Sequence, residues 1–130
     1  MARILVADDN RPNLDLMLYL LRAFGHDAEG TEDGNATLQA AESGGFDLIL
    51  SDVLMPGIDG YELARRVRAN AAISWTPLLA VTALAMVGDR ERVLAAGFDG
   101  YLSKPIDAES FVPEIDSYLP PEKRSRAPAT

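Results

Sequence analysis

The sequence contains no cysteine, only one histidine and no long apolar run. Without cysteine the chain can form no disulfide, no thiolate zinc site and no thiol nucleophile. No stretch approaches the about 20 apolar residues that cross a bilayer. The first ten residues, MARILVADDN, also lack the basic and apolar regions of a signal peptide. We therefore expect a cytoplasmic location and no membrane partner.

Positive charge is scarce as well. Lys and Arg number 12 against 20 Asp and Glu, which gives a formal net charge of -8. Because binding of nucleic acid depends on Lys and Arg that contact phosphates, we expect no direct nucleic-acid partner. Hydrophobic residues make up 48% and charged residues 25% of the 130 residues. This composition is typical of one globular domain with a single core.

Short apolar runs alternate with helical patterns along the chain. The runs lie at 3–7, 47–51, 77–81 and 101–103, with a weaker one at 26–30. Runs of this kind suit strands that are buried on both faces of a parallel sheet. Helical spacing of apolar residues is found around 14–21 and at 36–41, 61–68 and 89–96, with a last helix after the N-cap residue Asp107. Pro113 implies that this last helix either starts later or bends.

Five strands alternating with five helices predict an α/β fold: a single doubly wound parallel sheet with helices on both faces. We expect the domain to span residues 1–119. Residues 120–130, PPEKRSRAPAT, have no apolar period and are expected to be a disordered tail or a linker stump.

Polar side chains follow four of the expected strands: Asp8 and Asp9, Asp52, Thr82 and Lys104. In an open parallel sheet, ligands bind outside the carboxyl ends of the strands. Each residue alone has an ordinary explanation, as a cap, a strand-end hydroxyl or a solvated charge. Four such strand ends together indicate a functional site.

This group of side chains suits phosphoryl transfer. Three carboxylates at close range repel one another, and Mg²⁺, or alternatively Mn²⁺, would relieve that repulsion. An aspartate can act as a nucleophile toward phosphorus and form an aspartyl phosphate. The ammonium of Lys104 and the hydroxyl of Thr82 can stabilise the charge on the phosphoryl oxygens.

The segments around these residues resemble the receiver domains of response regulators in bacterial two-component signalling, including the chemotaxis regulator. The resemblance rests on the Asp pair after the first strand and on DLILSDVLMPGIDG, AVTALA and YLSKP, and it covers residues 3–119. It implies a flavodoxin-like strand order 2-1-3-4-5. It also implies a phosphorylation-dependent switch, not a conventional enzyme.

The resemblance further implies a role for each site residue. Asp52 would accept a phosphoryl group from a histidine kinase or a histidine phosphotransfer protein. Asp9, Asp52 and the backbone carbonyl of Leu54 would ligate Mg²⁺, and Asp8 would act mainly through a bound water. Lys104 would pair with the phosphoryl oxygens.

The same resemblance implies a switch pair, Thr82 and Tyr101, and a cis peptide between Lys104 and Pro105. The threonine would move toward the phosphoryl group and the aromatic ring would turn inward behind it. This change would remodel a surface for a downstream protein, formed by the fourth helix, the fifth strand and the fifth helix.

Two other functions fit the residues less well. A Mg²⁺-dependent phosphohydrolase of similar fold usually carries a second Asp two residues after its nucleophile, where this chain has Leu54. A nucleotide or flavin binder would carry GxxxxGK[ST] or GxGxxG, and neither motif is present. Whether the chain is a stand-alone regulator, the receiver of a hybrid kinase or part of a longer regulator stays open.

Three further residues complete the interpretation. Leu54 and Leu84 lie two positions after Asp52 and Thr82, where the resemblance places the path of a hydrolytic water. Because both side chains are apolar, we expect slow loss of the phosphoryl group. His26 follows a helix-stopping glycine, and we expect it to be exposed and without a catalytic or metal role.

Overall fold

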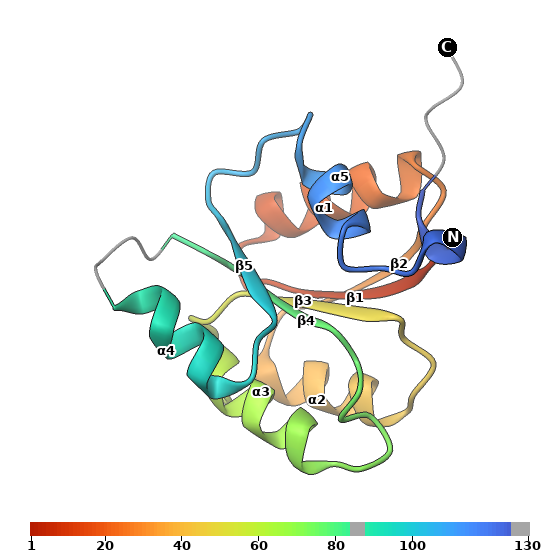
Figure 1. Cartoon of the computed structure of the whole chain (residues 1–130). Coiled ribbons are helices and arrows are strands. Elements are labelled where there is room, and N and C mark those ends of the chain that lie inside the picture. Colours follow the sequence, from red (N-terminus) through yellow and green to blue (C-terminus); the bar gives the residue numbers. More distant parts are fainter. Residues whose placement is uncertain (84–87, 126–130) are drawn as a thin grey trace.

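A computed structural model describes residues 1–83 and 88–125 of the chain (Figure 1). Its parallel sheet has the strand order β2-β1-β3-β4-β5. The strands are β1 (Arg3–Ala7), β2 (Asp27–Thr31), β3 (Leu48–Ser51), β4 (Leu78–Thr82) and β5 (Gly100–Ser103). The predicted fold class and the strand order 2-1-3-4-5 are therefore confirmed.

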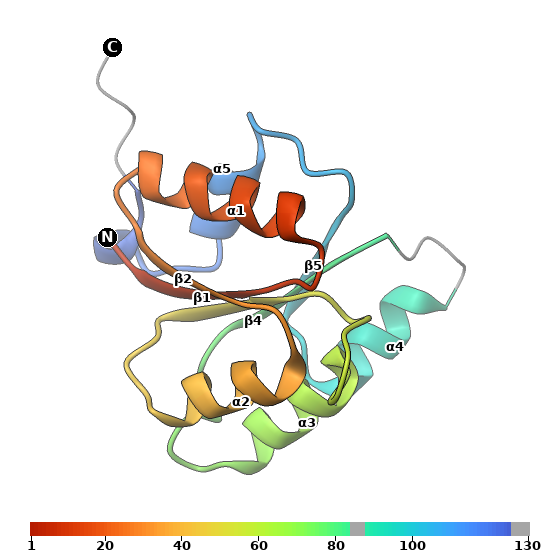
Figure 2. The same cartoon turned by 180° about the vertical axis from the view of Figure 1, so that it is seen from behind.

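Helices cover both faces of this sheet (Figures 1 and 2). One face carries α1 (Arg11–Ala23) and α5 (Phe111–Asp116), and the other carries α2 (Gly34–Glu42), α3 (Gly60–Ala69) and α4 (Asp89–Ala96). Successive residues of β1 serve opposite faces: Ile4 and Val6 join the core beneath α1 and α5, and Leu5 joins the core beneath the other three helices. Burial on both sides explains why the strands are continuously apolar.

Three helices begin at side-chain caps close to the ends of strands. Asn10, Asp33 and Asp59 each accept a hydrogen bond from the backbone N–H three residues later, at the starts of α1, α2 and α3. These caps satisfy donors that the helix itself leaves unpaired. They fix the positions at which the chain turns from the carboxyl edge of the sheet into the helical layers.

The last helix begins later than Asp107. Its N-cap is Ser110, and the Oδ1 of Asp107 instead accepts a hydrogen bond from the N–H of Glu109 at 3.0 Å, within the preceding turn. Pro113 therefore falls in the first turn of α5, where its missing N–H leaves no helical bond unmade. Of the two alternatives for Pro113, the later start is the correct one.

The expectation that His26 is exposed is wrong. Its side chain is fully buried and links distant parts of the chain. Its Nδ1 accepts a hydrogen bond from the N–H of Ala2 at 3.0 Å, and its Nε2 lies 2.9 Å from the Oδ1 of Asp116 in α5. Because Nδ1 is an acceptor, Nε2 carries the hydrogen and donates a hydrogen bond to Asp116. No local pattern signals partners this far away.

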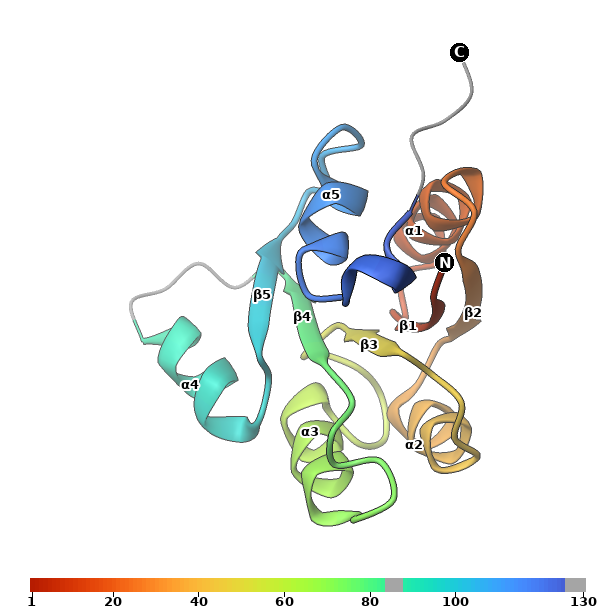
Figure 3. The same cartoon turned by 45° about the vertical axis from the view of Figure 1, so that its right-hand side comes forward.

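The C-terminal segment also differs from the expectation over its first residues. A 3-10 helix, η1 (Pro121–Lys123), lies beside the start of the chain (Figure 3). The amino group of Met1 donates to the carbonyl of Glu122 at 3.4 Å, and Ser125 donates both its N–H and its hydroxyl to Asp116. Polar contacts, which hydrophobic periodicity does not reveal, hold this segment. The expected tail beyond residue 125 lies outside the described residues.

Within residues 1–83 and 88–125, no helix has the length and apolar character required to cross a membrane.

Replacement of His26 by alanine should destabilise the protein by about 2–3 kcal/mol, because the N–H of Ala2 and the carboxylate of Asp116 both lose a buried partner. Urea unfolding of the parent and of His26→Ala measures this loss. Tyr19→Ala is the control, since Tyr19 is 70% exposed and its removal should change stability by no more than about 0.5 kcal/mol. Equal stability of the two variants would contradict the assigned network.

Candidate functional site

The ends of the strands are tied together by backbone hydrogen bonds at one edge of the sheet. The N–H of Asp52 donates to the carbonyl of Ala7 at 2.9 Å, and the N–H of Lys104 donates to the carbonyl of Thr82 at 3.0 Å. These bonds continue the parallel ladders just beyond the strands. They bring the residues selected from the sequence to one edge, although these residues lie up to about a hundred positions apart.

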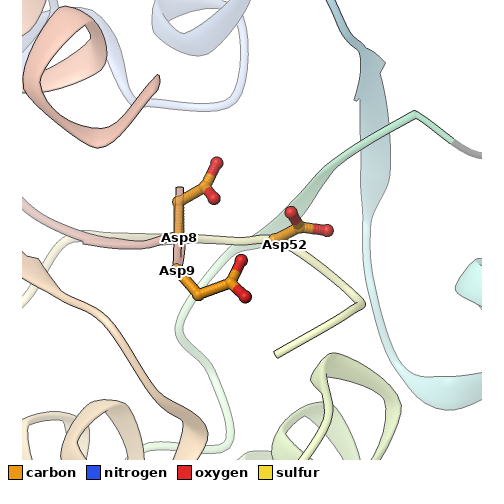
Figure 4. Close-up of side chains that lie close together, drawn as sticks. All are labelled: Asp8, Asp9 and Asp52. Atoms are coloured by element: carbon orange, nitrogen blue, oxygen red, sulfur yellow. The ribbon is translucent and has the colours of Figure 1, made fainter. Parts of the chain in front are cut away.

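Three carboxylates meet at this edge (Figure 4). Asp8 and Asp9 leave the end of β1 on opposite sides of the ribbon, and Asp52 lies beside them at the end of β3. Each offers one oxygen, and these oxygens lie within 4.8 Å of one another. Asp8 and Asp52 are buried, whereas Asp9 is exposed. A cluster of hard oxygen ligands that is open on one side fits a Mg²⁺ ion that keeps several waters.

Lys104 is the cation of this site. Its Nζ lies 2.6 Å from the Oδ2 of Asp52 and 2.9 Å from the Oδ2 of Asp8, and its side chain is only 14% exposed. Burial by itself lowers the pKa of Lys104, but the hydrogen bonds and charges of Asp52 and Asp8 outweigh burial, so its pKa is raised. Three carboxylates and one ammonium leave a net charge of -2, which a divalent cation would neutralise.

Backbone amides hold the other oxygens of the two buried carboxylates. The Oδ1 of Asp8 accepts from the N–H of Asn10 at 2.9 Å, and the Oδ1 of Asp52 accepts from the N–H of Leu54 at 3.1 Å. Each buried carboxylate therefore has one oxygen on the backbone and one on Lys104. The direct pairing of Asp8 with the lysine was missed from the sequence. The alternation of side chains along β1, which sends one Asp inward and its neighbour outward, could have indicated it.

Gly60 is a further residue of the site. A Cβ at this position would lie 2.5 Å from the carbonyl oxygen of Asp52 and 2.6 Å from the Cα of Val53. The N–H of Gly60 also donates to the carbonyl of Val53 at 2.9 Å. The first residue of α3 thus packs directly on the backbone of Asp52, and only glycine permits this approach.

The expected switch residues lie on the neighbouring strands β4 and β5. Thr82 is buried at the end of β4 and is paired in register with Ser103 of β5. Tyr101 is half-buried and packs against the core beneath α3 and α4. The Lys104–Pro105 peptide is cis, as predicted.

The two leucines expected beside the phosphoryl group cannot both be placed. Leu54 is 62% exposed and lies next to Asp52, whereas Leu84 lies outside the described residues. Of the expected metal ligands, the structure therefore brings the three carboxylates together. It places the backbone of Leu54 beside them through its bond to Asp52.

Comparison with known proteins gives consistent matches over nearly the whole chain. The family described as the response regulator receiver domain matches residues 4–116. A curated relative is the polar-differentiation response regulator DivK of Brucella ovis, which is 35% identical over 116 residues. That match covers 89% of this chain and 94% of the relative.

Solved structures agree with this result. The chemotaxis response regulator CheY4 of Vibrio cholerae superposes with a TM-score of 0.86 at 30% identity, and the match covers 92% of this chain and 99% of CheY4. The receiver domain of the sensor histidine kinase PA1611 of Pseudomonas aeruginosa gives a TM-score of 0.83 at 33% identity, with 90% and 96% covered. In that protein a magnesium ion is coordinated in the active-site cleft.

Removal of the lysine charge should reduce stability in a pH-dependent way. Because the pKa of Lys104 is raised in the folded state, its stabilisation is fully present below the unfolded-state pKa of about 10.4 and is lost as pH rises through the higher folded-state value. Without metal, Lys104→Met should be less stable than the parent by about 2 kcal/mol at neutral pH. The difference should shrink above about pH 10.4.

Urea unfolding in EDTA from pH 7 to pH 11 measures this difference. Lys123→Met is the matched control, because Lys123 is 44% exposed and lies 3.8 Å from its nearest carboxylate, Asp47. A stability loss in Lys104→Met that stays constant with pH would show that packing of the aliphatic stem, not the charge, carries the effect.

Proposed function

This chain belongs to the response regulator receiver domains of two-component signalling, and we propose that Asp52 is the residue that accepts the phosphoryl group. Receiver domains are phosphorylation-dependent switches and phosphoacceptors, not conventional enzymes. They bind Mg²⁺ at an acidic pocket and interact with histidine kinases and downstream targets. The observation that carries the assignment to Asp52 is its 2.6 Å contact with Lys104 inside a cluster of three carboxylates.

The position of Asp52 supports its role as nucleophile. It is buried, its backbone is fixed by Ala7 and Gly60, and both of its carboxylate oxygens have partners. Such fixation favours in-line approach to a phosphoryl donor. Asp8 is fully buried and Asp9 lies outside the hydrogen-bonded group, so neither is as well placed to receive the phosphoryl group.

In the proposed reaction a carboxylate oxygen of Asp52 attacks the phosphorus of a phosphohistidine on a histidine kinase or a histidine phosphotransfer protein. A P–O bond forms as the P–N bond breaks, and the electron pair of the broken bond stays on the imidazole nitrogen, which then takes a proton from water. The negative charge of the Asp52 carboxylate is lost from the site with the imidazole nitrogen, the phosphoryl group keeps its own charge, and Lys104 exchanges its carboxylate partner for the phosphoryl oxygens. Thr82 donates its hydroxyl to another phosphoryl oxygen.

Asp9, Asp52 and the backbone carbonyl of Leu54 would hold Mg²⁺, with Asp8 acting mainly through a water. The fit rests on the excess negative charge and on the close approach of the three carboxylate oxygens. The bound ion would neutralise charge on the phosphoryl oxygens. The exposure of Asp9 leaves this side of the cluster open to an ion and its waters.

We place the output surface on α4, β5 and α5, with Thr82 and Tyr101 as the switch pair. Two exposed apolar side chains on this surface, Leu94 (41%) and Tyr118 (40%), support the placement. They line a cavity of about 200 Å³ together with Tyr101, so a rotation of that ring would change the shape of the cavity. Phosphorylation would shift the two-state equilibrium of this surface and so select a downstream protein.

Incubation with acetyl phosphate and Mg²⁺ should add one phosphoryl group, and Asp52→Asn should add none, because the amide is not a nucleophile. Intact-mass spectrometry checks both samples, and an EDTA sample tests the need for metal. A phosphoryl group on Asp52→Asn would move the acceptor to another residue. If the parent gains none, binding of beryllofluoride separates a site that demands its own kinase from one that cannot hold a phosphoryl group.

Loss of the phosphoryl group should be slow, because the side chain of Leu54 cannot hydrogen-bond a water beside Asp52. Leu54→Asn supplies that hydrogen bond and should raise the decay rate by about tenfold. Decay of the phosphorylated protein in Mg²⁺ is measured by intact mass, and Leu54→Met is the apolar control. An unchanged rate in Leu54→Asn would remove this side chain from control of the lifetime.

A further inference from the structure

Helices α3 and α4 carry an unusual share of the positive charge. Of the 12 Lys and Arg in the chain, five lie on these two helices, while the chain as a whole has a net charge of -8. They are Arg65, Arg66, Arg68, Arg90 and Arg92. Three of them have carboxylate partners: Arg65 and Arg66 share Glu62, and Arg68 pairs with Asp99.

A small cavity lies between the two helices. Its volume is about 190 Å³, and its lining consists of Tyr61, Arg65, Arg92, Ala95 and Ala96. The only charged groups of this lining are guanidinium groups. Sites for drug-sized ligands range from about 300 to 1,000 Å³, so this cavity suits a smaller group. Its charge selects anions, since guanidinium forks match the geometry of carboxylate and phosphate oxygens.

Arg92 is an exposed residue whose guanidinium has an aromatic partner. Its guanidinium lies over the ring of Tyr61, 5.0 Å from the ring centroid. This cation–π contact orients the group without neutralising it. No salt bridge to Arg92 is formed within the part of the chain that the structure describes. Arg65 shares the single carboxylate of Glu62, which lies 3.2 Å away.

Tyr61 provides the second, independent observation. The residue is only 9% exposed, and among the described residues its buried hydroxyl has no hydrogen-bond partner. An unpaired buried hydroxyl is costly, and proteins rarely leave one without a function or a missing partner. Tyr61 lines the same cavity as the two guanidinium groups. A shift of the ring toward the cavity would give this hydroxyl a partner, and the cavity already holds Arg92, which has no carboxylate partner among the described residues.

We propose that the cavity between α3 and α4 binds a small oxyanion the size of inorganic phosphate, held by Arg92, Arg65 and the hydroxyl of Tyr61. The bound anion would connect α3, which begins on the backbone of Asp52, to α4. The site is separate from the carboxylate cluster and needs no Mg²⁺. Its test is therefore independent of phosphoryl transfer to Asp52.

The experiment is a titration of the ¹⁵N-labelled full chain with sodium phosphate in EDTA, followed by amide shifts in ¹H–¹⁵N NMR spectra. A sodium chloride series at matched ionic strength removes the general salt effect. We expect saturable shifts at the amides around Tyr61, Arg65 and Arg92–Ala96. Arg92→Gln and Tyr61→Phe should each weaken binding, the former by about tenfold.

Arg90→Gln is the matched control, because it removes the same charge from the same helix outside this cavity and should bind phosphate like the parent. Arg65→Gln serves as a second test if the spectrum of Arg92→Gln indicates that its fold is altered. Shifts that do not saturate, shifts that centre elsewhere, or equal weakening by Arg90→Gln would overturn the proposal. So would unchanged binding in Arg92→Gln or in Tyr61→Phe.

Discussion

The ammonium of Lys104 lies 2.6 Å from Asp52 and 2.9 Å from Asp8, and it stabilises the carboxylates that meet at the carboxyl edge of the sheet. Parallel pairing brings three carboxylates to this edge, and their mutual repulsion opposes folding unless a cation lies among them. Lys104 directly follows β5, the last strand along the chain, so the charge balance forms only when the sheet is complete. One ammonium does not balance three carboxylates, and a divalent ion can neutralise the remaining negative charge.

The two faces of the sheet are secured in different ways. On the face of α1 and α5, Asp116 joins His26, which contacts Ala2, to Ser125 beyond η1. On the other face, Arg68 of α3 donates to the carbonyls of Ser74, Thr76 and Gly97 and pairs with Asp99. Both networks lie away from the carboxylates, so the chemistry at the carboxyl edge is supported from the opposite end of the strands.

The fold and the meeting of the three carboxylates with Lys104 could be predicted from the sequence, because burial on both faces makes the strands apolar and because parallel strands end at one edge. What could not be predicted depends on contacts between distant residues. His26 and Asp116 are 90 positions apart, and no periodicity connects them. Pro113 likewise allowed either a later start or a bend of α5, and the sequence did not decide between them. The close approach of Gly60 to the backbone of Asp52 can be recognised only in the structure.

The contact between Met1 and η1 has a topological consequence. Since the amino group of Met1 contacts the carbonyl of Glu122, a short peptide linker could join η1 to Met1. New termini could then open at the turn of Gly44 and Gly45, both of which have positive φ. Such a circular permutant would keep every strand in register and the carboxylates untouched. The site therefore requires the spatial arrangement of the strands and does not require the order in which they are synthesised.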